Sequence, residues 1–212
     1  SDDLIVWRKR GVVFKEVDEK LENTLSFKSG LIVTRLAGDR MIATKINGKY
    51  WMYWNVGDLY LATSDDLIHW EPVMNEDGSY YAPALQPRPD GMHVDDFMCE
   101  PGPAALLTDH GIVVFYNGIS YTSGVKKNDL VLGDLTWVGV QALFDKNNPL
   151  KLIDRANEAF IKPDRDYEMT GQVNNVTFIE GLVYFKGNWF IYYGTADSYI
   201  AVAVAPGKKK GK

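Results

Sequence analysis

Residues 48–62 read GKYWMYWNVGDLYLA, and residues 187–201 read GNWFIYYGTADSYIA, which repeats the same pattern without a gap. Each copy has a glycine, an aromatic residue two positions later, an aromatic pair and then Asp-x-Tyr-(Leu/Ile)-Ala. Residues 110–118, HGIVVFYNG, form a weaker third copy. A glycine-containing turn before an alternating aromatic run, followed by a second short apolar run, predicts a β-hairpin in each copy.

A second repeat covers SDDLIVW at residues 1–7 and SDDLIHW at residues 64–70, which agree at six of seven positions. Helical periodicity is confined to residues 16–27. Further runs typical of strands cover residues 31–36, 40–46, 102–108, 129–133, 136–144, 175–179 and 182–186. Repeats spaced by roughly 60–75 residues, each with several short strands, predict the blades of an all-β propeller. A β-sandwich is the alternative.

The repeats also predict how the chain is organised. SDDLIHW closes a blade whose inner strands precede it, whereas SDDLIVW opens the chain. We therefore expect about three blades within residues 1–205, with upstream blades supplied by a longer polypeptide or a second chain. Residues 206–212, which contain four lysines, are expected to be a basic tail.

Composition excludes several classes of function. The 212 residues carry a net charge of −5 with a pI near 5.2, which argues against nucleic acid as a partner. No apolar run is long enough to span a bilayer, and no membrane partner is expected. Cys99 is the only cysteine, so no internal disulfide forms, and either a cytoplasmic or a periplasmic location is compatible. The three histidines lie far apart, and neither a metal nor a cofactor is expected.

The ordered phrases LATSDDLIHW, EPGPAALLTDHGIVVFYNG, ALFDKNNPLKLIDR and NNVTFIEGLVYFKGNWFIYYGTADSYIAVA resemble glycoside hydrolase family 130. The resemblance covers residues 1 to about 205. It implies a five-bladed β-propeller that acts on β-linked mannosides, either as a phosphorylase or as a β-1,2-mannosidase, with inversion at the anomeric carbon. It also implies that the general acid is an aspartate in an early blade, outside this chain.

Two glutamates are the candidate catalytic residues. Inverting hydrolysis needs one carboxyl group to protonate the leaving oxygen and another to activate water. The phosphorylase pattern Arg-Ile-Gly-Ala-Gly-Pro falls on residues 98–103, so that Met98 replaces the phosphate-binding arginine and Glu100 replaces a glycine. Glu180 stands where phosphorylases carry histidine or cysteine. We therefore expect Glu100, Glu180 or both to position water, the alternative being a loop cap or an ion pair with arginine.

Further residues match family phrases and are expected to contact substrate: Asp197, Asp96, Tyr116, Asn117, Tyr193, Arg155, Tyr167, Glu168 and Arg40. For Asp197 the alternative is a turn-capping role, and for Arg155 it is a structural ion pair. Of Asp95 and Asp96, one is expected to be solvated. Arg40 is expected to compensate in part for a lysine of the phosphorylases, since Ala37 occupies the lysine position.

The sequence therefore predicts an inverting β-mannoside hydrolase that takes an oligosaccharide. A β-mannoside phosphorylase is the first alternative, and a non-catalytic glycan-binding fragment is the second. A furanosidase with a similar propeller is the third, although the YYGTAD phrase argues against it.

Overall fold

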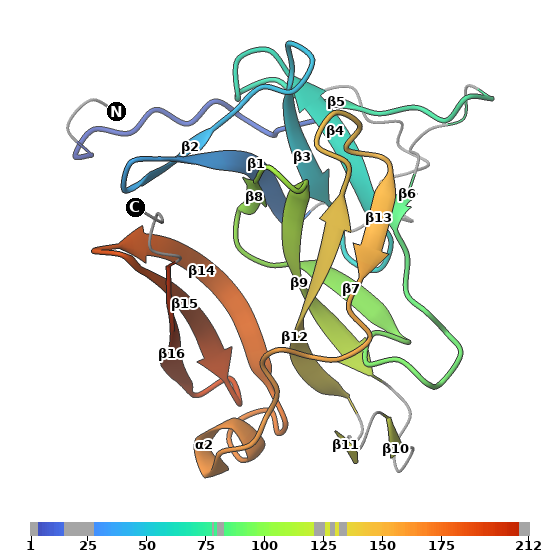
Figure 1. Ribbon diagram of the computed structural model, residues 1–212, viewed down its shortest axis with the longest axis vertical. Coiled ribbons are helices and arrows are strands. Elements are labelled where there is room, and N and C mark those ends of the chain that lie inside the picture. Colours follow the sequence, from blue (N-terminus) through green and yellow to red (C-terminus); the bar gives the residue numbers. More distant parts are fainter. Residues whose placement is uncertain are drawn as a thin grey trace.

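The computed structural model describes residues 4–14, 28–77, 79, 83–120, 126–127, 130–131 and 135–207. The predicted helix at 16–27 and the lysines of the predicted tail lie outside the described residues. Within the described part, the chain is almost entirely β, with one short helix, so the expected fold class is confirmed at that level (Figure 1).

Most of the strands are short. The first eight are β1 (Gly30–Ala37), β2 (Arg40–Ala43), β3 (Tyr50–Trp54), β4 (Leu59–Ser64), β5 (Glu71–Pro72), β6 (Pro83–Leu85), β7 (Met98–Pro101) and β8 (Ala105–Leu107). The rest are β9 (Ile112–Ser120), β10 (Lys126–Lys127), β11 (Leu130–Val131), β12 (Thr136–Phe144), β13 (Leu152–Arg155), β14 (Thr177–Phe185), β15 (Asn188–Thr195) and β16 (Tyr199–Pro206). The helix α2 covers Asp166–Met169.

The strands form one large sheet and two small ones. The main path of the 11-stranded sheet is β13-β12-β9-β8-β1-β3-β4-β5, with β2, β6 and β7 attached to β1, β4 and β9. The strands β14-β15-β16 form a separate antiparallel sheet, and β10-β11 pair by themselves. Figure 1 shows the three-stranded sheet beside the large one, with β14 as its strand nearest to β12.

Both predicted repeats correspond to repeated structure. The two copies of the aromatic pattern form the hairpins β3–β4 and β15–β16. In the SDDLI repeat, Leu4 and Leu67 occupy matching positions and adopt left-handed backbone angles, φ 61° and 66°. Around Leu67 the turn is closed by Ser64 and Asp66, whose side-chain oxygens accept backbone N–H groups at 2.8–3.2 Å.

The structure corrects two of the expected strand boundaries. Residues 175–179 and 182–186 do not form two strands, because β14 runs continuously through them. The register against β15 shifts between Ile179 and Gly181, so Glu180 lies in a β-bulge between the two expected strands. Of the expected strand at 102–108, only Ala105–Leu107 forms a strand, β8, and Glu100 lies on the separate strand β7, which ends at Pro101.

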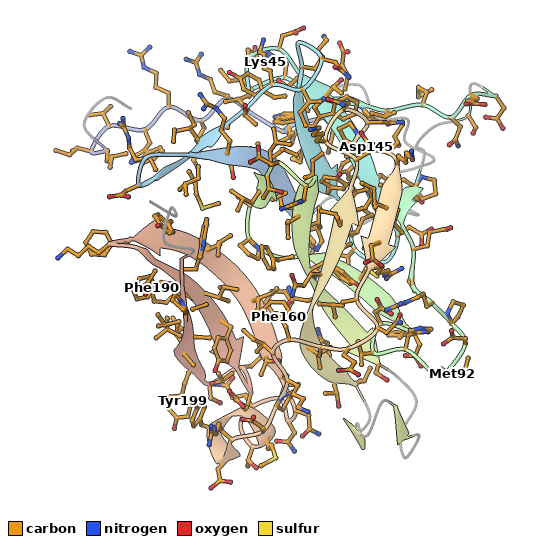
Figure 2. The ribbon with its side chains drawn as sticks, in the orientation of Figure 1. Lys45, Met92, Asp145, Phe160, Phe190 and Tyr199 are labelled. Atoms are coloured by element: carbon orange, nitrogen blue, oxygen red, sulfur yellow. The ribbon has the colours of Figure 1, made fainter. Side chains whose placement is uncertain are left out.

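The main core lies within the large sheet. Val33, Leu61, Val114 and Val140 are fully buried there. Phe160 lies between β12 and β14 (Figure 2), and its ring stands edge-on to that of Phe115 at 5.7 Å between centroids. The two sheets are therefore joined by apolar packing.

The outer strand of the small sheet is unusual in its exposure. β16 carries no charged side chain, and Tyr199, Ile200, Val202 and Val204 are 46–81% exposed. Among the described residues β16 pairs only with β15, which leaves its other edge open.

Candidate active site

Glu100 lies on β7, directly opposite Asn117 on β9. Residues paired across two antiparallel strands point to the same face, so the two side chains share one face of the β7–β9 ribbon. The Glu100 side chain is 12% exposed, and its Oε1 lies 3.5 Å from Nζ of Lys28. Glu100 is thus a largely buried carboxylate whose described ionic partner, Lys28, is 64% exposed.

Asn117 joins this face to β14. Its Nδ2 donates to the Ile179 carbonyl at 3.2 Å, and its Oδ1 accepts from the Ile179 N–H at 2.7 Å. Asn117 is fully buried, and its side-chain amide clamps the backbone of Ile179, so its contact with substrate stays a prediction. The clamp fixes Ile179 on β14, and the next residue, Glu180, is exposed.

The opposite face of the ribbon carries a buried ion network around Asp95. Arg88 binds Asp95 through Nε at 2.8 Å and Nη2 at 3.1 Å, and Arg155 Nη2 binds it at 2.6 Å. The Tyr116 hydroxyl donates to Asp95 at 2.5 Å and accepts from Arg155 Nε at 2.9 Å. The alternative assignment of Arg155 to an ion pair is therefore confirmed. Burial, followed by the nearby Asp95 charge, raises the pKa of Tyr116 well above its usual value.

Tyr116 and Asn117 do not share a site. Successive residues of a strand point to opposite faces, and here Tyr116 meets the ion network while Asn117 meets β14. A common contact of these two side chains with one sugar ring is therefore not supported by the structure. Gly118 allows the Asp95 loop to approach β9, because a Cβ there would lie 3.0 Å from the Asp95 Cβ and 2.9 Å from Val140.

Cys99 lies next to Glu100 but points toward the ion network, where Arg155 Nη2 donates to its Sγ at 3.2 Å. Burial is the main cause that raises the pKa of the Cys99 thiol to about 12. The expectation that one of Asp95 and Asp96 is solvated is wrong, since they are 0% and 8% exposed. Asp95 has a structural role in the ion network. The expected contact of Asp96 with substrate stays a prediction.

Glu168, which is expected from the sequence to contact substrate, is 2% exposed. Its Oε2 accepts the N–H groups of Asp164 and Arg165 at 2.9 and 3.0 Å, which caps the start of α2. Its Oε1 accepts the Tyr193 hydroxyl at 2.8 Å. Burial and this carboxylate raise the pKa of Tyr193. The Glu168–Tyr193 pair holds α2 against β15. The neighbouring Tyr167 is 44% exposed, and its contact with substrate stays a prediction.

Asp197 occupies the exposed turn between β15 and β16. Ala196 and Asp197 have φ values of 45° and 49°, and the Ser198 N–H donates to the Thr195 carbonyl at 2.9 Å. Two successive positive φ angles are typical of a tight hairpin turn, so Asp197 has a turn role whether or not it also meets a sugar. Arg40 is exposed at the start of β2, beside the turn from β1.

Sequence reasoning did not find Lys28 or Arg88. Lys28 precedes the first strand by two residues, and nothing in its sequence context indicates a contact with Glu100, which is 72 positions away. Arg88 lies in a proline-rich loop, QPRPD, that has no strand pattern. Among the described residues no group of three His, Cys, Asp or Glu side chains could hold a metal ion, and no helix could span a membrane.

The family model of glycoside hydrolase family 130, described as beta-1,4-mannooligosaccharide phosphorylase, matches residues 1–209. The chain belongs to family 130. It is 27% identical over 205 residues to a 1,2-beta-oligomannan phosphorylase of Thermoanaerobacter sp. (strain X514), covering 96% of this chain and 56% of that relative. The chain therefore spans little more than half the length of this curated relative.

Solved structures of family 130 proteins match the fold closely. A glycosyl hydrolase from Bacteroides ovatus is 41% identical with a TM-score of 0.85, covering 99% of this chain and 57% of that one. Another structure belongs to work on family 130 glycoside hydrolases that target beta-1,2 mannosidic linkages in Candida mannan. It is 37% identical with a TM-score of 0.85, covering 98% of this chain and 56% of that one.

Proposed function

We propose that the chain forms part of an enzyme that cleaves β-linked mannosides. The support is membership of family 130 together with relatives named for β-mannan phosphorolysis or for hydrolysis of β-1,2 mannosidic linkages. Residues 1–205 would contribute about three blades of a five-bladed propeller, with residues 206–212 as a tail. The remaining blades and the general acid would come from an upstream segment or from a second chain.

The acceptor of the mannosyl group is either water or phosphate. Our proposal for water rests on Glu100, a largely buried carboxylate where the phosphorylase pattern has glycine, next to Met98 where that pattern has arginine. A carboxylate repels phosphate, and a methionine cannot pair with it. The names of the curated relatives, in contrast, support phosphorolysis better than hydrolysis, so phosphorolysis is the second candidate.

In the hydrolytic reaction, the water oxygen attacks the anomeric carbon while the bond to the leaving oxygen breaks. Glu100 takes the proton of the attacking water, and the acid outside this chain gives a proton to the leaving oxygen. Glu180, at the bulge beyond the Asn117 clamp, would orient the same water. In phosphorolysis, a phosphate oxygen replaces the water and no base is needed, which makes the two reactions separable.

A substrate with an acidic leaving group tests this proposal on the complete propeller, formed by this chain with its upstream segment or partner chain. 2,4-Dinitrophenyl β-mannoside needs no general acid, so release of dinitrophenol depends on the base and the sugar site. We expect Glu100→Gln to lower the rate by about 10²–10⁴-fold. Glu71→Gln, at an exposed position on β5, is the matched control and should leave the rate unchanged.

The products identify the acceptor. Mannose as the sugar product, at a rate independent of added phosphate, supports hydrolysis. Mannose 1-phosphate, at a rate that rises with phosphate, would replace the hydrolase proposal by the phosphorylase. A release rate of the complete propeller that Glu100→Gln leaves unchanged would contradict the proposal that this chain holds the base.

A further inference from the structure

A groove lies at the end of the strands opposite to the candidate active site. It has a volume of about 710 Å³ and is formed by the end of β1 and by the turns β8–β9, β12–β13 and β14–β15. On β14, Ile179 faces Asn117, whereas Tyr184 lines the groove five residues further along. At about 3.3 Å per strand residue, this places the groove roughly 16 Å from the Asn117 clamp.

One wall of the groove is aromatic. Tyr184 and Trp189 are paired across β14 and β15, with ring centroids 4.8 Å apart and planes inclined by 58°. Both side chains are half-buried, so each has part of its ring open to the groove. Because their strands form one tight hairpin, the two rings present a rigid apolar surface before any ligand arrives.

The other wall is polar and charged. Arg35 comes from β1, Asp109 from the β8–β9 turn, and Lys146 and Asn147 from the β12–β13 turn. Within the described part of the chain, no ion pair within 4.0 Å engages Arg35, Asp109 or Lys146. The groove therefore combines aromatic rings with donors and an acceptor that the surrounding protein leaves available.

This combination matches the two sides of a pyranose ring. The ring carries C–H groups on its faces, which pack against aromatic side chains, and hydroxyl groups at its edge, which donate and accept hydrogen bonds. A purely apolar ligand would strip water from three charged groups without replacing their hydrogen bonds. The volume lies in the range of about 300–1,000 Å³ that is usual for small-molecule sites.

We propose that this groove is a second oligosaccharide-binding site, separate from the site of cleavage. It holds mannan-type chains by stacking on Trp189 and Tyr184, by hydrogen bonds that Arg35 and Asn147 donate, and by hydrogen bonds that Asp109 accepts. The choice of a mannan-type ligand rests on the proposed function. A site of this kind keeps the enzyme on its polymeric substrate and raises the local concentration of linkages at the catalytic end.

Saturation-transfer NMR of the 212-residue chain with β-1,2-mannotriose and β-1,4-mannotriose tests the proposal. We expect millimolar binding of at least one trisaccharide, weakened at least tenfold by Trp189→Ala. Trp7→Ala is the matched control, because Trp7 is 70% exposed and lies outside the groove. Asn147→Ala gives a milder second variant, since the Asn147 backbone carbonyl keeps its bond from Asn47. We expect it to weaken binding several-fold.

The outcomes separate this proposal from the proposed function. Binding lost in Trp189→Ala and Asn147→Ala but kept in Glu100→Gln supports the groove. Binding lost in Glu100→Gln but kept in both groove variants overturns the groove proposal and leaves the proposed function standing. Absence of binding by both trisaccharides also overturns the groove proposal, while the dinitrophenyl assay tests cleavage independently.

Discussion

Replacement of Asp95 by asparagine should destabilise the chain severely. Asp95 is fully buried and accepts four hydrogen bonds, two from Arg88, one from Arg155 and one from Tyr116. The two arginine side chains are only 18% and 10% exposed, so water can replace little of what the carboxylate supplies. Removing one partner from a buried ion pair costs about 3–5 kcal/mol because the remaining charge stays buried.

The asparagine amide would keep one acceptor oxygen, so we expect a loss near the lower limit, about 3 kcal/mol. For a chain of this size, that corresponds to a fall in Tm of roughly 6–12 °C. Urea unfolding followed by tryptophan fluorescence measures the loss. Asp90→Asn is the matched control, because Asp90 lies in the same loop, pairs with His93 and is exposed, and its loss should be far smaller. A loss below about 1 kcal/mol for Asp95→Asn would refute the reasoning that this network holds the loop.

Further predictions concern three residues, Cys99, Asn117 and Glu168. Cys99, whose pKa is raised to about 12, should resist thiol reagents at pH 8 until the chain unfolds, and rapid labelling of the folded chain would contradict its burial. Because an unfolded cysteine ionises near pH 9, this thiol should also make stability fall as the pH rises from 9 toward 12. Asn117→Ala should cost about 2–4 kcal/mol and speed hydrogen exchange at the Ile179 amide, and an unchanged exchange rate would refute the clamp. Glu168→Ala should cost about 1–2 kcal/mol in urea unfolding by uncapping α2, and an unchanged midpoint would contradict this.

The local β-structure could be predicted because its signals lie close together in the sequence. The glycine turn and aromatic alternation of residues 187–201 specify a hairpin without any distant contact, and β15–β16 forms there. The strand at 136–144 is predictable for the same reason. The structure at Glu180-Gly181 is harder to predict from sequence, because a β-bulge and a turn use similar residues. Only the pairing with β15 distinguishes the two.

The roles of polar residues were harder to predict, because they depend on partners far away in sequence. Arg155 meets Asp95 and Tyr116 across separations of 60 and 39 residues. Glu168 could not be recognised as a cap from its sequence, since the preceding Arg165 is not a usual capping residue. The match to family sequence motifs marks Arg155 and Glu168 as candidates. It does not distinguish a side chain that stabilises the fold from one that contacts a sugar.

The open edge of the strand β16 has a consequence for the isolated chain in solution. Within the described part of the chain, this edge leaves backbone hydrogen-bonding groups unpaired next to valine, isoleucine and tyrosine side chains, and β16 carries no charge to keep a second copy away. Concentrated stocks should therefore self-associate through this edge, and light scattering across a dilution series would detect it. A single lysine in place of Val202 should keep the solution clear at protein concentrations where the parent turns cloudy.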